Sequence, residues 1–150
     1  MSRTRFDSME CSIAQSLDQI GDWWSLLIVR DAMRGMRRFG EFHESLGISR
    51  NILTQRLGRL VEQGVLERRD VGQHGTHWEY RLTAKGRDLF PVIIALLQWG
   101  DKWIYFGENL PVVMRDRATG RPVAPVRVTD ADGRPLELRD VNLSQRPEED

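Results

Sequence analysis

The sequence has a single cysteine and no uninterrupted run of 18 apolar residues. One thiol, Cys11, cannot form a disulfide within the chain, which is typical of proteins from a reducing compartment. The lack of a long apolar run argues against a transmembrane helix, and residues 1–12 have no hydrophobic segment of the kind found in signal peptides. We therefore expect a cytoplasmic protein that makes no use of a membrane.

Motifs for catalysis are also missing. The chain has no His-Glu-x-x-His sequence, no glycine-rich phosphate loop, and no Ser, His and Asp set in a recognisable context. His74 and His77 have a spacing seen at metal sites, but they lie in a glycine-rich loop with no cysteine ligand nearby. We expect no enzyme activity, no cofactor and no bound metal.

The chain also has no net charge, with 22 basic and 22 acidic side chains, but these are unevenly distributed. Residues 34–87 contain eleven basic and six acidic residues, a balance of +5, whereas residues 1–33 and 88–150 sum to −2 and −3. A basic segment between acidic ones favours a local contact with a polyanion.

Apolar residues at helical spacing predict four short helices in the first 64 residues, over 12–20, 22–34, 39–46 and 49–64. Gly21, Gly35, Gly47 and Gly64 follow them as stop signals. The second helix, WWSLLIVRDAM, is apolar on nearly all sides and is expected to be buried.

The helix over 49–64 has the clearest signals of the four. Ser49 is a good N-cap, and Ile48 and Leu53 are spaced as a hydrophobic staple. Its inward stripe consists of Leu53, Leu57, Leu60 and Val61. Only about three residues separate it from the preceding helix, which is typical of a helix-turn-helix motif.

After residue 64 the apolar periodicity changes to two. VLERRDV and WEYRLT are expected to pair as a β-hairpin across GQHGTH, which makes residues 65–83 a wing. Thr83 is expected to cap a long helix in which Pro91 produces a kink or a fresh start. The similar turns TGRPV and DGRPL, thirteen residues apart, predict a small β-meander in the tail, and the last residues, SQRPEED, are expected to be disordered.

The polar side of helix 49–64 carries residue types that contact nucleic acids. Arg pairs with guanine, Asn and Gln pair with adenine, and Thr contacts phosphate or a thymine methyl group. We predict Arg50, Asn51, Thr54 and Gln55 as base readers, and Arg56 and Arg59 as residues that contact phosphates or hold the helix in place. The other predicted DNA-binding residues are Arg38 and Ser49 at the helix starts and Arg68, Arg69, His74 and His77 in the wing. Arg68 and Arg69 alternate along a strand and cannot both face DNA.

Two stretches, CSIAQSLDQIGDWWSLLIVRDAMRGMRRFGEFHESLGISRNILTQRLGRLVEQGVLERR and YRLTAKGRDL, resemble the HxlR-type winged helix-turn-helix regulators, which are relatives of the MarR-like group. The resemblance runs from Cys11 to about Gly107. It implies a homodimeric bacterial transcription regulator whose first and last helices form the dimer interface. Trp23 departs from the family, which usually has Lys or Arg there, and the tail is not required by the core family.

The apolar surface of the last helix has two interpretations, a dimer seam or an aromatic ligand pocket between subunits. We favour the seam and assign it Ile13, Leu17, Ile94, Leu97, Trp99, Trp103 and Phe106.

Cys11 also has two interpretations. It stands at a helix start, and some HxlR-type regulators sense oxidants or electrophiles with a cysteine in this place. Alternatively it is a small buried apolar residue.

The sequence therefore predicts a mainly α-helical winged helix-turn-helix domain over 11–109 and a β-rich extension over 110–150. We expect a homodimeric, sequence-specific regulator, by default a repressor, that binds a palindromic double-stranded DNA operator and responds to a small molecule, an electrophile or an oxidant. The competing interpretation is a winged-helix module that binds protein and not DNA.

Overall fold

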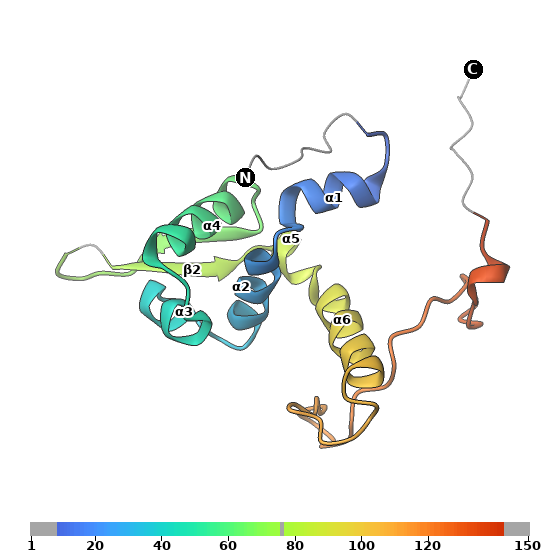
Figure 1. Ribbon diagram of the computed structural model, residues 1–150. Helices are drawn as coiled ribbons and strands as arrows, with labels where there is room; N and C mark the ends of the chain where they lie inside the picture. The colour runs from blue at the N-terminus through green and yellow to red at the C-terminus, as the bar shows by residue number, and fades with distance from the viewer. Residues whose placement is uncertain (1–8, 76, 143–150) are drawn as a thin grey trace. The chain divides into compact units, whose positions relative to one another are not determined.

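The computed structural model describes residues 9–75 and 77–142. The chain divides into two compact units, one ending at Ile93 and the other beginning at Ile94, inside the last long helix. We call their described residues the N-terminal unit (9–93) and the C-terminal unit (94–142) (Figure 1). Within the described ranges, no helix is long and apolar enough to span a membrane.

The N-terminal unit begins with four helices: α1 (Ser12–Ile20), α2 (Trp23–Met33), α3 (Phe39–Leu46) and α4 (Arg50–Glu62). The Asp22 carboxylate caps α2 by accepting hydrogen bonds from the backbone N–H groups of Trp24 and Ser25. The Ser49 hydroxyl caps α4 by accepting one from the Ile52 N–H, at 3.2 Å. All four predicted helices are confirmed.

The connection between α3 and α4 consists of Gly47, Ile48 and Ser49. Gly47 has φ 63°, a left-handed conformation that glycine adopts without steric cost, and it ends α3. Ile48 and Leu53 are both buried in the core cluster, as expected for the predicted staple. This short turn makes the pair a helix-turn-helix.

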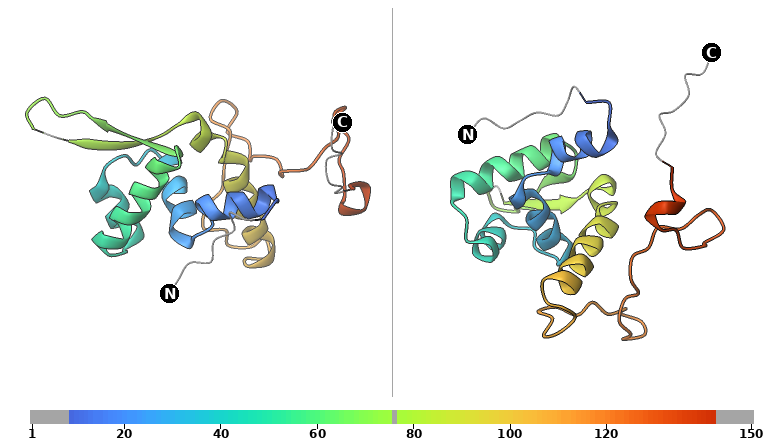
Figure 2. Two further views of the ribbon diagram at one scale, coloured as in Figure 1. Left: turned by 90° about the horizontal axis from the view of Figure 1, so that it is seen from above. Right: turned by 45° about the vertical axis from the view of Figure 1, so that its right-hand side comes forward.

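Two antiparallel strands follow, β1 (Leu66–Asp70) and β2 (Trp78–Leu82). Leu66 lies opposite Leu82 and Arg68 lies opposite Tyr80. Figure 1 and the left view of Figure 2 show the distal end of this hairpin extending beyond α3 and α4. The predicted wing is confirmed.

The core of the N-terminal unit joins α2, α3, α4 and β1. Its buried members are Ile28, Val29, Phe42, Ile48, Leu53, Leu57, Leu60, Val65 and Leu66. The expectation that the run WWSLLIVRDAM is buried is wrong at its first residue, because Trp23 is 87% exposed.

The predicted long helix is divided in two, α5 (Ala84–Arg87) and α6 (Phe90–Trp103). The Thr83 hydroxyl caps α5 by accepting a hydrogen bond from the Gly86 N–H. Pro91 stands in the first turn of α6, where its missing N–H would have no helical partner in any case. Of the two predicted effects of Pro91, the structure has the fresh start.

The C-terminal unit contains the second half of α6 and an extension that follows it. The predicted turns form: the Asp116 carboxylate accepts a hydrogen bond from the Ala118 N–H, and the Asp130 carboxylate accepts one from the Arg134 N–H. The predicted β-meander is wrong, since residues 111–142 contain only two isolated bridges, Arg115 with Pro122 and Thr129 with Pro135. Proline lacks the N–H that would continue either ladder.

A short 3₁₀ helix, η1 (Leu138–Asp140), closes the described extension. The disorder expected for residues 144–150 falls outside the described residues. The boundary between the compact units lies earlier than the predicted division at residues 109 and 110, because the second half of α6 is hydrogen-bonded to the extension.

Candidate nucleic-acid interface

Helix α4 presents a polar face to solvent. Leu53, Leu57 and Leu60 are fully buried, so they fix the rotation of the helix about its axis. The four predicted base readers, Arg50, Asn51, Thr54 and Gln55, are all exposed on the first two turns. These are the turns of a recognition helix that normally reach base edges.

Two of these four side chains are partly held by the protein itself. The Arg50 guanidinium lies 5.5 Å from the centre of the Phe39 ring, which places it beside the start of α3. The Thr54 hydroxyl donates a hydrogen bond to the Arg50 carbonyl oxygen at 2.8 Å. Thr54 therefore offers a partner its methyl group and the remaining acceptor capacity of its oxygen.

Arg56 and Arg59 point the other way, toward the corner between α1 and α2. The Arg56 Nε lies 3.2 Å from the Asp22 carboxylate, and an Arg59 Nη2 donates to the Asp18 carbonyl oxygen. Both arginine side chains are 29% exposed. Of the two roles predicted for them, this arrangement supports holding the helix and leaves them poorly available to phosphates.

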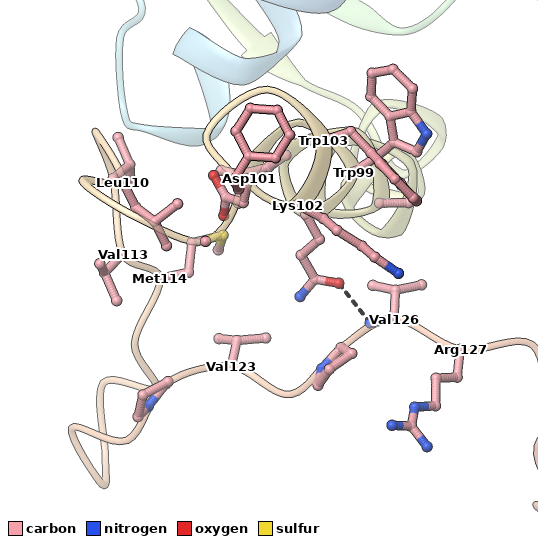
Figure 3. Close-up of a pocket in the computed structure, with 18 residues that line it drawn as sticks. Trp99, Asp101, Lys102, Trp103, Leu110, Val113, Met114, Val123, Val126 and Arg127 are labelled. Carbon is pink, nitrogen blue, oxygen red and sulfur yellow. Dashed lines mark hydrogen bonds between the residues drawn. The ribbon is translucent and has the colours of Figure 1, made fainter.

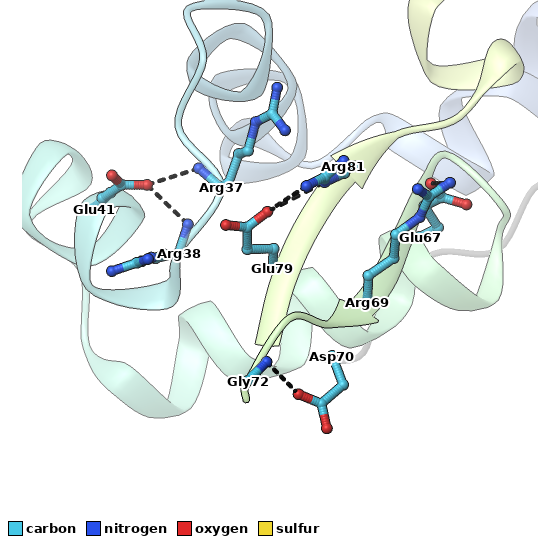
Figure 4. Close-up of polar contacts among 9 residues, drawn as sticks. All are labelled: Arg37, Arg38, Glu41, Glu67, Arg69, Asp70, Gly72, Glu79 and Arg81. Carbon is cyan, nitrogen blue, oxygen red and sulfur yellow. Dashed lines mark hydrogen bonds and ion pairs between the residues drawn. The ribbon is translucent and has the colours of Figure 1, made fainter. Parts of the chain in front are cut away.

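The two faces of the wing hold their arginines by different contacts. On one face Arg69 pairs with Glu67 at 2.6 Å and Arg81 pairs with Glu79 at 2.8 Å (Figure 4). On the other face Arg68 lies over the Trp78 ring, 4.0 Å from its centre. Arg68 and Arg69 thus lie on opposite faces, as predicted, and Arg69 is the one held by a carboxylate.

The tip of the wing is organised around Asp70. Its carboxylate accepts hydrogen bonds from the N–H groups of Gly72 and His77, at 2.9 and 3.1 Å (Figure 4 draws the first). These two bonds lower the pKa of Asp70. The side chains of His74 and His77 are exposed. No group of three or more candidate metal ligands occurs in the described parts of the chain.

Arg37 is a further exposed cation that was not predicted from the sequence. The N–H groups of Arg37 and Arg38 donate to the Glu41 carboxylate, each at 2.8 Å (Figure 4). The Arg37 carbonyl oxygen accepts a hydrogen bond from the Tyr80 N–H. The two N–H groups lower the pKa of Glu41. The side chains of Arg37 and Arg38 are exposed beside the wing. The Arg-Arg pair before a predicted helix was the available signal.

The arginines of α4, of the wing and of the segment just before α3 fall into two groups. Arg56, Arg59, Arg69 and Arg81 are each paired with a carboxylate. No described acidic side chain forms an ion pair with Arg37, Arg38, Arg50 or Arg68. We call these four the unpaired arginines. They come from the start of α3, the start of α4 and the wing, the three elements that surround the polar face.

The residues assigned to the dimer interface differ in exposure. On α1, Ile13 is 71% exposed and Leu17 is also exposed. On α6, Trp99 and Trp103 are exposed, as is Phe106 just after it. Leu97 is half-buried. Ile94 is only 4% exposed, so it has no surface left for a partner, and we leave it out of the interface.

Cys11 is exposed and occupies the N-cap position of α1 without a side-chain capping bond. It lines a surface cleft of about 670 Å³, together with Gln15, Gln19 and Lys85. The interpretation of Cys11 as a buried apolar residue is therefore wrong. The thiol is accessible to reagents in solution.

A short turn between two helices, a polar second helix and a basic hairpin define a winged helix-turn-helix protein. The family model for the HxlR-like helix-turn-helix matches residues 19–107. The chain belongs to this family. The prediction of a transcription regulator of HxlR type is confirmed at this level.

Similar proteins agree with this assignment. An uncharacterized HTH-type transcriptional regulator of Mycobacterium tuberculosis is 38% identical over 136 residues, which cover 91% of this chain and 86% of that protein. The crystal structure of PA1607, a candidate transcription factor, has 45% identity and a TM-score of 0.88, and covers 95% of this chain and 100% of that one. The redox regulator HypR in its reduced form has 28% identity and a TM-score of 0.58, over 65% of this chain and 99% of that one.

These coverages separate two groups. The matches to the mycobacterial regulator and to PA1607 continue through most of the C-terminal extension, whereas the match to HypR covers a share of the chain that the winged domain alone accounts for. The extension is therefore an addition shared by some relatives of this chain.

Proposed function

We propose that this protein is a homodimeric repressor that binds a palindromic operator with α4 in the major groove and the wing beside it. The observation that carries the proposal is the exposed face of Arg50, Asn51, Thr54 and Gln55 on a helix whose opposite side is locked in the core. Two such helices in a dimer read half-sites about one helical turn apart.

The four unpaired arginines support the same proposal because they can contribute to the affinity for DNA. Contacts to phosphates supply most of the binding free energy of such proteins and make it strongly dependent on salt. A cation already paired with a carboxylate of its own chain gives up that partner before it can bind a phosphate. None of Arg37, Arg38, Arg50 and Arg68 forms such an ion pair with a described carboxylate, although Glu41 attracts Arg37 and Arg38 electrostatically.

The test uses Gln55→Ala, with Gln63→Ala at the C-terminal end of the same helix as the matched control. The operator is first located by footprinting the regions upstream of the protein's own gene and its neighbours. Fluorescence anisotropy on that duplex and on a random duplex should show that Gln55→Ala costs about 1–3 kcal/mol on the operator only. Gln63→Ala should bind both duplexes as the parent does.

The competing proposal, a protein-binding winged helix, makes the opposite prediction. Binding to its partner would change little with salt and would tolerate the loss of Gln55. If Gln55→Ala bound the operator and the random duplex as tightly as the parent, the assignment of base reading to this face would be wrong.

We also propose that Cys11 receives an oxidant or electrophile signal. Its exposure at the start of α1 supports this, as does the likeness to a protein named as a redox regulator. With no second cysteine in the chain, the product is a bridge to the partner subunit, a mixed disulfide or an adduct. Diamide treatment should weaken operator binding by the parent and leave Cys11→Ser unchanged, and identical titrations for all samples would refute the role.

A further inference from the structure

The C-terminal unit has almost no core of its own. Among residues 94–142 only Ile94 is buried. A segment of about this length does not hold a defined path by itself without disulfides, metals or a partner. Its large exposed apolar side chains are Leu96, Trp99, Trp103, Ile104, Tyr105, Phe106, Val112, Val113, Val123, Val126, Val128, Leu138 and Val141.

One polar side chain holds the extension against α6. The Gln98 amide donates from Nε2 to the Ala124 carbonyl oxygen at 3.0 Å and accepts at Oε1 from the Val126 N–H at 2.7 Å. It thereby satisfies two backbone groups of the extension as a neighbouring strand would. Earlier in the extension, the Val123 N–H donates a hydrogen bond to the Met114 carbonyl oxygen at 3.0 Å. The chain over 114–126 therefore has a defined position relative to the second half of α6.

This docking leaves an open groove between α6 and the extension. The groove has a volume of about 760 Å³, and Trp99, Trp103 and Phe106 line one side of it. Val123 and Val126 line the other, and Figure 3 shows both valine side chains directed from the extension toward the helix.

The apolar surface here is larger than a monomer usually exposes. The rings of Trp99, Trp103 and Phe106 are 60, 56 and 78% exposed. Since each aromatic side chain has roughly 150–250 Å² to bury, the three rings together present on the order of 400 Å². That already equals a large patch on a typical monomer, about 300–600 Å², and the valines and leucines of the extension add to it.

The groove is lined by charged residues of both signs. Asp101 contributes one carboxylate to its lining, and Lys102 and Arg127 contribute two cations. In a two-fold symmetric interface each residue of one copy meets the same residues of the other in exchanged roles, so Asp101 of one copy can pair with Arg127 of the second. A small aromatic ligand would fill the groove but leave Ile104 and Val128 exposed.

We propose that this groove is the seat of a second copy of the chain, and that the extension over 111–128 forms part of the dimer interface. The aromatic edge of α6 from one copy enters the groove that the Gln98-docked extension forms in the other. This rests on the homodimer of the proposed function and goes beyond it, because α6 alone would supply only one wall. A standard stable interface needs about 800 Å² from each partner, more than the three rings provide.

The test is the oligomeric state of the full chain, measured by sedimentation velocity over a range of concentrations. Val123→Asp places a charge in the groove, and Val71→Asp in the wing is the matched control, since the two valines are 38 and 40% exposed. Each dimer would contain two buried charges, so Val123→Asp should raise the dimer Kd at least about 100-fold, while Val71→Asp should behave as the parent. Gln98→Leu removes the docking bonds without adding a charge and should raise the Kd about tenfold, which covers the case in which Val123→Asp does not fold.

The outcomes separate this inference from the proposed function. A dimeric parent whose Val123→Asp and Gln98→Leu variants dimerise equally well would overturn the role of the extension and leave a dimer formed through α1 and α6. A parent that is monomeric at tens of micromolar would leave the groove to a small ligand or another protein, and would overturn both this inference and the homodimer.

Discussion

Arg50 and Arg56 lie six positions apart on α4, and the same substitution should affect them in opposite ways. Arg56 is 29% exposed and lies 3.2 Å from the carboxylate of Asp22, which is itself 14% exposed. Arg50 is exposed, and its side chain contacts the Phe39 ring. We predict that Arg56→Ala destabilises the fold and that Arg50→Ala weakens operator binding.

The loss in the free energy of unfolding caused by Arg56→Ala depends on which hydrogen bonds the Asp22 carboxylate keeps in the variant. The Arg56 Nε lies within ion-pair distance of the Asp22 carboxylate but forms no hydrogen bond with it, and removing one partner of a buried ion pair costs about 3–5 kcal/mol when the other is left alone. Asp22 is not left alone, because it still accepts from the N–H groups of Trp24 and Ser25 and from the Ser25 hydroxyl. With partial exposure also reducing the effect, we expect a loss of about 1–2 kcal/mol in the free energy of unfolding.

Urea denaturation followed by circular dichroism measures this loss. With a slope of about 1–3 kcal/mol per molar urea, the midpoint of Arg56→Ala should fall by roughly 0.5–1 M. Arg50→Ala should shift it by much less, because an exposed cation–π contact contributes only about 0.5–1 kcal/mol. On the operator, Arg50→Ala should lose about 1–3 kcal/mol and Arg56→Ala less than about 0.5 kcal/mol.

The reverse result would refute these roles of Arg50 and Arg56. If Arg56→Ala kept the urea midpoint of the parent and lost operator affinity as Arg50→Ala does, then Arg56 would contact DNA, and its pairing with Asp22 would not persist in the complex.

Two further predictions concern glycines in helices. Gly58 is exposed in α4 and an added Cβ meets nothing within 4 Å, so Gly58→Ala should raise the free energy of unfolding by about 0.5–1 kcal/mol. Gly86 in α5 is buried and its Cβ would lie 2.2 Å from the Val65 carbonyl oxygen, so Gly86→Ala should lower it by about 1–3 kcal/mol. Urea midpoints that moved in the same direction for both variants would contradict this account.

The elements of the N-terminal unit could be predicted from local signals. Asp22 and Ser49 cap their helices in the structure as expected from sequence, and Gly47 ends α3 in the left-handed conformation that glycine favours. The alternation of VLERRDV and WEYRLT predicted the hairpin. Each of these signals acts within a few residues, so one sequence is sufficient to detect it.

Features that depend on distant residues were predicted less well. The sequence left two roles open for Arg56 and Arg59, since their partners, Asp22 and Asp18, come from the α1–α2 corner. The exposure of Trp23 and the burial of Ile94 likewise depend on what other segments cover. In the extension the two Gly-Arg-Pro turns were correct, but proline limited the strands to single bridges.

The sequence by itself determined that this chain is a winged helix-turn-helix protein of HxlR type and which helix presents a polar face. Capping, periodicity and turn residues are encoded locally, and they suffice to set the order and type of the elements. Tertiary structure decided which arginines remain unpaired and that Gln98 positions the extension on α6. Ion pairing and burial are properties of residues brought together by the fold, and spacing along the chain does not specify them.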